Sequence, residues 1–106
     1  MSEEFHHACA TDEISDGEMK LVEVDERLVI LFRVGDEFHC IDDVCTHDGG
    51  TLSDGELDGC QIECPRHGAR FDIRDGKALS MPATQDTLAH QVRVEGDQVL
   101  VKLTEI

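Results

Sequence analysis

The sequence predicts a small all-β protein. Its apolar residues come in short runs rich in Val, Ile and Leu, and Gly and Asp at turn-like positions separate these runs. No long stretch has the 3.6-residue periodicity of an amphipathic helix. A chain of 106 residues fits one domain with a modest core, so we expect a single domain over residues 1–106.

The first part of the chain predicts a meander of short strands. These strands are expected at residues 5–10, 19–24, 28–34 and 37–41. An acidic, turn-rich stretch separates the first two, and turns at residues 25–27 and 35–36 join the others.

The second part is loop-rich before it returns to strands. Residues 42–70 are dominated by Gly, Asp, Thr and Ser, with room only for short strands near residues 56–57 and 61–63. Further strands are expected at residues 70–73, 91–95 and 98–103, the last two in a hairpin. The simplest architecture is one small β-barrel or sandwich with a functional site on its loops.

Negative charge is concentrated in the first two-thirds of the chain. The formal net charge is −15; residues 1–65 contain three basic and 18 acidic side chains, whereas residues 66–106 contain six of each. Such an acidic protein should repel nucleic acid and anionic membranes and attract basic protein surfaces. A purely solubilising role for these carboxylates is an equal alternative.

Targeting and membrane signals are missing from the sequence. No apolar stretch reaches the roughly 20 residues that a membrane-spanning helix needs, and the acidic N-terminus resembles neither a signal nor a transit peptide. We therefore expect a soluble, cytoplasmic protein. The five cysteines are an odd number, which excludes a complete set of intrachain disulfides and favours a reducing compartment or a metal site.

Two short Cys/His pairs stand out in the loop-rich region. Cys45 and His47 form the first pair and, after 16 intervening residues, Cys64 and His67 form the second. If both cysteines bind one iron and both histidines the other, the pairs can hold a [2Fe–2S] cluster. Zinc is an alternative, because two Cys and two His are also a common zinc set. Zinc fingers usually group Cys with Cys and His with His, however, and unrelated buried cysteines and turn histidines remain the structural alternative.

The segments around these pairs resemble the two cluster-binding loops of the Rieske family. Residues 45–50 read CTHDGG and residues 64–72 read CPRHGARFD. They match the family in the order of both ligand pairs, in the Pro after the second Cys and in the Gly after the second His. The similarity extends over residues 5–103 and is closest to the Rieske ferredoxins of bacterial ring-hydroxylating oxygenases.

The resemblance implies a Rieske-like fold of small antiparallel sheets with two cluster-binding loops at one tip and a third loop around Pro82. It implies one [2Fe–2S] cluster bound by Cys45, His47, Cys64 and His67. The implied function is a soluble one-electron carrier, not an enzyme, that passes electrons from a reductase to a terminal non-haem iron oxygenase and has no small-molecule substrate of its own.

Other functions compete with this interpretation. A redox sensor or an iron–sulfur assembly accessory protein would use the same cluster and is the alternative function. An oxygenase catalytic subunit would need a mononuclear iron site and a substrate cavity, for which the chain is too short.

Four positions differ from the respiratory-complex Rieske proteins. Gly50 and Arg66 stand where those proteins have an extra pair of disulfide-bonded cysteines. Ala69 and Phe71 stand where they have a Ser and a Tyr whose hydroxyls donate hydrogen bonds to sulfur. With fewer donors the reduced cluster is less stabilised, so we expect a reduction potential at the low end of the family's range.

Three further cysteines and two further histidines are not assigned to the metal site. Cys9, Cys40 and Cys60 lie at or near strand-like stretches and are expected to be small buried hydrophobes. His39 and His90 have no partner motif nearby.

Acidic residues flank the first ligand pair. Asp42, Asp43 and Asp48 are interpreted as a solvated acidic rim rather than as a site for a hard cation. The Gly residues lack phosphate-loop or dinucleotide spacing, so no nucleotide site is inferred.

Overall fold

The computed structural model describes residues 5–43, 52–65, 68–80 and 86–104. In these ranges the protein has one 3-10 helix, η1 (Thr11–Glu13), and no helix long and apolar enough to cross a membrane. The strands are β1 (His6–Ala10), β2 (Met19–Val24), β3 (Arg27–Val34), β4 (Glu37–Asp42), β5 (Glu56–Asp58), β6 (Gln61–Glu63), β7 (Arg70–Asp72), β8 (Ala89–Glu95) and β9 (Gln98–Lys102).

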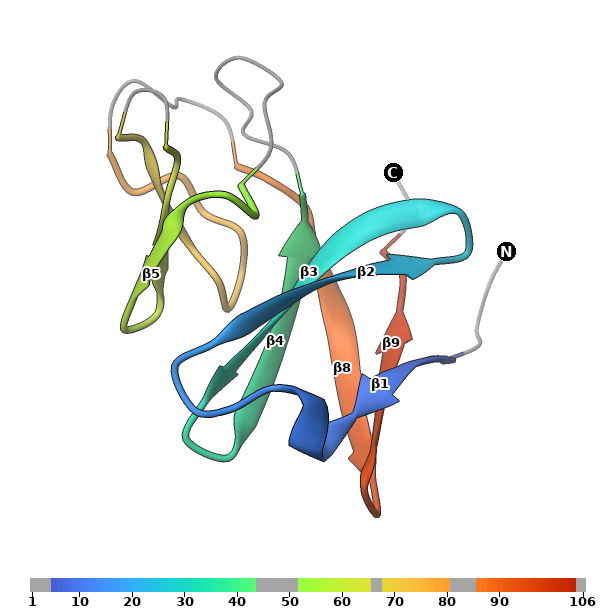
Figure 1. The fold of residues 1–106 in the computed structure, drawn as a ribbon. Helices are drawn as coiled ribbons and strands as arrows, with labels where there is room; N and C mark the ends of the chain where they lie inside the picture. The colour runs from blue at the N-terminus through green and yellow to red at the C-terminus, as the bar shows by residue number, and fades with distance from the viewer. Residues whose placement is uncertain (1–4, 44–51, 66–67, 81–85, 105–106) are drawn as a thin grey trace.

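These strands form two antiparallel sheets (Figure 1). The larger sheet has six strands in the order β1-β9-β8-β4-β3-β2, and its outer strands β1 and β2 contact each other, so the sheet is a nearly closed barrel. The smaller sheet has three strands in the order β5-β6-β7 and lies beside the barrel. The predicted all-β barrel of small antiparallel sheets is therefore confirmed.

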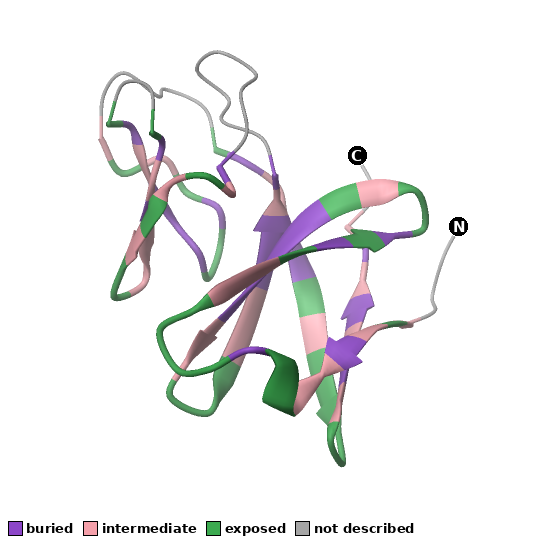
Figure 2. Ribbon diagram, in the orientation of Figure 1, coloured by how far each residue is buried: buried purple, intermediate pink, exposed green. Residues whose placement is uncertain are grey.

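Two hydrophobic cores meet at β3, which is buried on both faces (Figure 2). Val29 and Leu31 point into the barrel, whereas Ile30 and Phe32 belong to a second core that the barrel shares with the small sheet. Side chains alternate between the two faces of a strand, so a strand covered on both sides reads as a continuous apolar run. The small sheet is thus held against the barrel by apolar packing.

The predicted strand positions agree closely with the observed ones. One difference is the β2–β3 turn, which is one residue shorter than expected and consists of Asp25 and Glu26. Both residues have left-handed backbone, with φ of +49° and +67°, as a type I′ hairpin turn requires. Asn or Gly usually occupies such positions, so Asp-Glu is a weak sequence signal for this tight turn.

Candidate metal centre

Cys64 is the predicted ligand that lies in the described residues. It follows β6 directly, and its side chain is only 1% exposed in the core between the barrel and the small sheet. Its thiol is not in a disulfide. Cys45, His47 and His67 lie outside the described residues, so their assignment as ligands stays a prediction.

Two backbone hydrogen bonds close the loop that follows Cys64. The Cys64 N–H donates to the Ala69 carbonyl across 2.7 Å, and the Gly68 N–H donates to the Cys64 carbonyl across 3.1 Å. Gly68 has a φ of +76°, a conformation that glycine adopts without steric cost. The glycine after the second His therefore turns the chain back into β7.

Asp43 closes the base of the segment that contains Cys45 and His47. Its Oδ1 accepts hydrogen bonds from the backbone N–H groups of Leu52 and Ser53, each at 2.8 Å, and its Oδ2 accepts one from the Ser53 hydroxyl at 3.1 Å. Asp43 is only 6% exposed. The interpretation as a solvated rim is wrong for this residue, because its carboxylate is buried and bound by three donors.

Leu52, which follows the segment with Cys45 and His47, packs in the same core as Cys64. A Cβ atom at Gly55 would collide with the carbonyl oxygen of Glu63, so only glycine permits this close approach of the two segments. Two thiolates and two imidazoles are the donor set of a [2Fe–2S] cluster with Cys on one iron and His on the other, so the chemistry of the four predicted ligands fits that group.

Asp42, the last residue of β4, is also not part of a solvated rim. Its carboxylate accepts two hydrogen bonds from Arg27, at 3.0 and 3.2 Å, and one from His90 at 2.7 Å. The backbone N–H of Thr104 donates to Nδ1 of His90 across 3.0 Å. This network ties the strand that precedes the first ligand pair to β3, β8 and the residues after β9.

This network has no signal in the local sequence. Asp42 and His90 are 48 positions apart, and no local motif connects them. Burial lowers the pKa of His90, and the hydrogen bond to Asp42 only partly offsets that effect. His90 is therefore a buried, neutral structural residue. No partner motif lies near His90 in the sequence, and its partners come instead from the end of β4 and from the residues after β9.

Ser80 fixes the segment before Pro82 beside the second loop. Its Oγ accepts a hydrogen bond from the Arg70 N–H at 3.1 Å, and the Leu79 N–H donates to the Arg70 carbonyl at 2.7 Å. Pro82 itself lies outside the described residues.

The arginines that follow the second pair are bound within the chain where the structure describes them. Arg70 lies 3.0 Å from Glu63 and 3.4 Å from Asp58. Arg74 lies 2.8 Å from Asp72, and this hydrogen bond holds the pKa of Asp72 below its ordinary value. These pairs reduce the positive charge that the sequence places here.

The other described cysteines are buried or partly buried. Cys9 and Cys40 lie in the barrel core, as predicted, and burial raises the pKa of both thiols. Cys60 is partly buried against the core shared by the two sheets. Cys9 and Cys40 are thus small hydrophobes that stay protonated at neutral pH.

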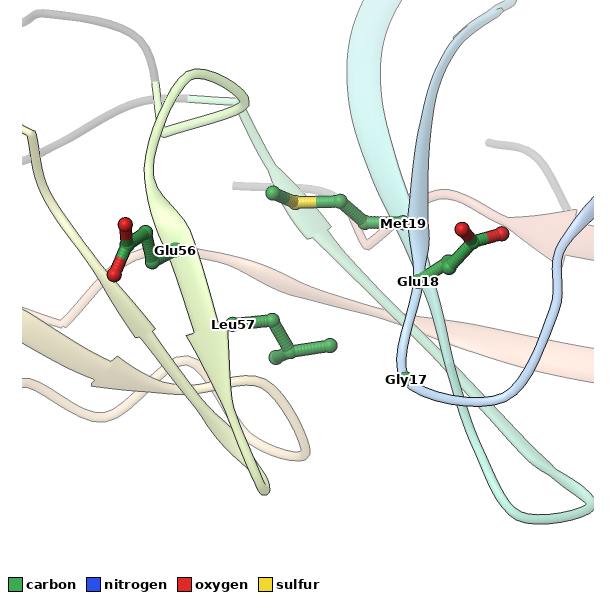
Figure 3. A pocket seen from close by; sticks show the side chains of 5 residues that line it. All are labelled: Gly17, Glu18, Met19, Glu56 and Leu57. Carbon is green, nitrogen blue, oxygen red and sulfur yellow. The ribbon is translucent and has the colours of Figure 1, made fainter.

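An open pocket of about 490 Å³ lies between the start of β2 and β5. Figure 3 shows the side chains of Met19 and Leu57 directed toward each other across it, with the carboxylates of Glu18 and Glu56 directed away. Both apolar side chains pack against the core between the sheets. The pocket is the outer margin of that packing.

Comparison with known proteins identifies the family. The model of the Rieske [2Fe-2S] domain matches residues 4–102. The ferredoxin component of the naphthalene 1,2-dioxygenase system of Pseudomonas aeruginosa is 38% identical over 104 residues, which are 98% of this chain and 100% of that protein.

Solved structures agree with this match. The ferredoxin of carbazole 1,9a-dioxygenase from Nocardioides aromaticivorans IC177 superimposes with a TM-score of 0.91 at 29% identity, over 94% of this chain and 98% of that one. A chain from a complex of reduced oxygenase and oxidized ferredoxin in carbazole 1,9a-dioxygenase gives a TM-score of 0.86 at 35% identity, over 94% of each chain.

These matches decide between the two cofactors left open by the ligand chemistry. The cofactor is a Rieske-type [2Fe–2S] cluster rather than zinc. The relatives are ferredoxin components, so the protein is an electron carrier rather than a catalytic enzyme. Because the family model matches residues 4–102 and the similarity to these ferredoxins covers nearly the whole chain, the chain belongs to the Rieske [2Fe–2S] domain family.

Proposed function

We propose that this protein is the ferredoxin of a multicomponent dioxygenase system, in which it accepts one electron at a time from a reductase and donates it to a terminal oxygenase. The observation that best supports the proposal is its similarity to ferredoxin components over 98% of its length. The complex of oxygenase and ferredoxin in carbazole 1,9a-dioxygenase supports an oxygenase as the electron acceptor.

The proposed ligands are Cys45 and Cys64 on one iron and His47 and His67 on the other. When bound, the cluster supplies a one-electron redox couple, and the protein supplies binding, orientation and electrostatics. Asp43 holds the base of the first loop, and the backbone bonds of Cys64 with Ala69 and Gly68 hold the second. Burial of Cys64 keeps water from its sulfur.

We further propose that residues 1–106 form one domain that works in the cytoplasm. The core shared by the barrel and the small sheet supports a single domain, because neither sheet buries that apolar face alone. The free thiols of Cys9, Cys40 and Cys60 suit a reducing compartment.

Stopped-flow absorbance with the reductase and terminal oxygenase of the same organism tests this function. The reductase should transfer one electron per chain, and the reduced protein should be reoxidised by the oxygenase in the presence of its substrate. Reduction without transfer to the oxygenase would contradict the carrier role and favour a sensor or an assembly protein.

A further inference from the structure

We propose that Asp43 is a positioning residue for the cluster: its hydrogen bonds fix the first cluster-binding loop, and its negative charge lowers the reduction potential. The inference rests on the proposed ligand set, because Cys45 and His47 lie in the segment that Asp43 closes. Asp43 itself is not a ligand in this account.

The hydrogen bonds of the Asp43 carboxylate join the two ends of the first loop, and we call this set of bonds the brace. The side chain of Asp43 reaches the backbone of Leu52 and Ser53, nine and ten positions further along the chain. The Ser53 hydroxyl adds a third donor. A short loop closed at its base has fewer conformations, so its ligands need less ordering when the cluster binds.

The brace is anchored in both parts of the fold. The backbone N–H of Asp43 donates to the Leu28 carbonyl in β3 across 3.3 Å. On the other side, Leu52 is fully buried in the core next to Cys64 and the small sheet. Asp43 therefore connects the first loop to the rigid barrel and to the core that holds the second loop.

The hydrogen bonds and the charge of Asp43 can be separated experimentally. Removing the side chain leaves two N–H donors without their acceptor, and Leu52 lies in a site that water does not reach. An asparagine at this position keeps an oxygen that accepts both N–H bonds but loses the negative charge. A buried charge two residues from Cys45 disfavours the addition of an electron to the cluster, so its removal should raise the potential.

Four variants of the full-length holoprotein test the proposal: Asp43→Ala, Asp43→Asn, Ser53→Ala and Glu56→Gln. The readouts are the rate of cluster loss to an iron chelator, the EPR line shape of the reduced protein, and the midpoint potential. Asp43→Ala should lose its cluster about tenfold faster than the wild type or more, with broadened EPR lines. Ser53→Ala removes one of the three bonds and should have an intermediate effect.

Asp43→Asn should lose its cluster at a rate close to that of the wild type and have a higher potential. Glu56→Gln is the matched control, because it removes the negative charge of an exposed carboxylate on β5 rather than of a buried one. It should change neither cluster loss nor line shape, and it should shift the potential less than Asp43→Asn does.

Two results would overturn the proposal: cluster loss from Asp43→Ala at the wild-type rate, or an Asp43→Asn variant with an unchanged potential. If Asp43→Ala does not fold, Asp43→Asn still decides, because rapid cluster loss from it would show that hydrogen-bond acceptance is not what Asp43 supplies. A wild-type protein without a [2Fe–2S] cluster would instead contradict the proposed function.

Discussion

His90 Nε2 donates a hydrogen bond to Oδ1 of Asp42 across 2.7 Å, and the side chain of His90 is completely buried. The tautomer follows from the other ring nitrogen: Nδ1 accepts the N–H of Thr104, so the proton is on Nε2. Protonation of Nδ1 would break that bond.

The first prediction concerns the pH dependence of stability. Burial holds the pKa of His90 below its ordinary value of 6.5, so the unfolded chain takes up a proton more readily than the folded protein. The contribution of neutral His90 to the free energy of unfolding is complete above pH 6.5, the pKa of an unfolded histidine. This contribution is lost as the pH falls toward the lower pKa of His90 in the folded state.

Urea unfolding of the wild type and His90→Gln measures this effect. At pH 8 the variant should have a free energy of unfolding lower by about 1–3 kcal/mol, because buried partners are left unpaired. The difference should shrink between pH 7 and pH 5. A difference that stays constant over this range would show that titration of His90 does not contribute.

The second prediction concerns the ligands. Cys64→Ala should abolish cluster assembly, because alanine offers no ligand atom and the buried site does not admit water as a replacement ligand. His47→Cys and His67→Cys should retain some cluster but lower its potential, because a thiolate adds negative charge where a neutral imidazole stood. Iron analysis and redox titration measure both effects, and normal iron content in Cys64→Ala would refute the ligand set.

The third prediction concerns the reduction potential. Rieske centres span roughly −150 to +300 mV, and this one should lie at the low end because Ala69 and Phe71 offer no hydroxyl donors. Ala69 is fully buried and its carbonyl is bonded to the Cys64 N–H, so a hydroxyl added at position 69 is close to Cys64. Ala69→Ser and Phe71→Tyr should each raise the potential in an EPR-monitored titration. A wild-type midpoint well above about +100 mV would show that the missing hydroxyl donors do not set the potential.

The fourth prediction concerns partner docking. The excess of acid in residues 1–65 should attract basic partner surfaces over long range. The association rate with the reductase should therefore fall with salt, since the Debye length shrinks from about 10 Å at 0.1 M to about 3 Å at 1 M.

Charge reversals test which side of the protein docks. Arg70 and Arg74 are already paired with carboxylates, so we expect Arg66 to orient the partner. Arg66→Glu should slow electron transfer more than Lys102→Glu. Equal effects of the two reversals, or a rate that does not change with salt, would exclude electrostatic docking and leave the cluster assignment intact.

The strands could be predicted because their pattern is local. The hairpin expected at residues 91–95 and 98–103 is observed as Ala89–Glu95 and Gln98–Lys102, because alternating apolar residues surround a Gly-Asp turn. The β5–β6–β7 sheet follows in the same way from its short apolar runs and turns.

The residues that support the metal centre could not be predicted. Asp42 and His90 meet only because β4 and β8 are neighbours in the sheet. The sequence around Asp43 is that of an ordinary loop aspartate, and its hydrogen-bond donor Leu52 lies nine positions further along the chain. The local sequence does not distinguish a buried aspartate from an exposed one. Charge patterning alone therefore favours the solvated interpretation at both Asp42 and Asp43.

Pulsed EPR of the purified, reduced protein, together with iron and acid-labile sulfide analysis, tests whether Cys45, His47, Cys64 and His67 bind a Rieske cluster. This ligand assignment predicts two irons and two sulfides per chain, and nitrogen couplings from imidazole ligands that change in His47→Cys and His67→Cys. A colourless protein with one zinc, or a cluster without nitrogen coupling, would contradict it.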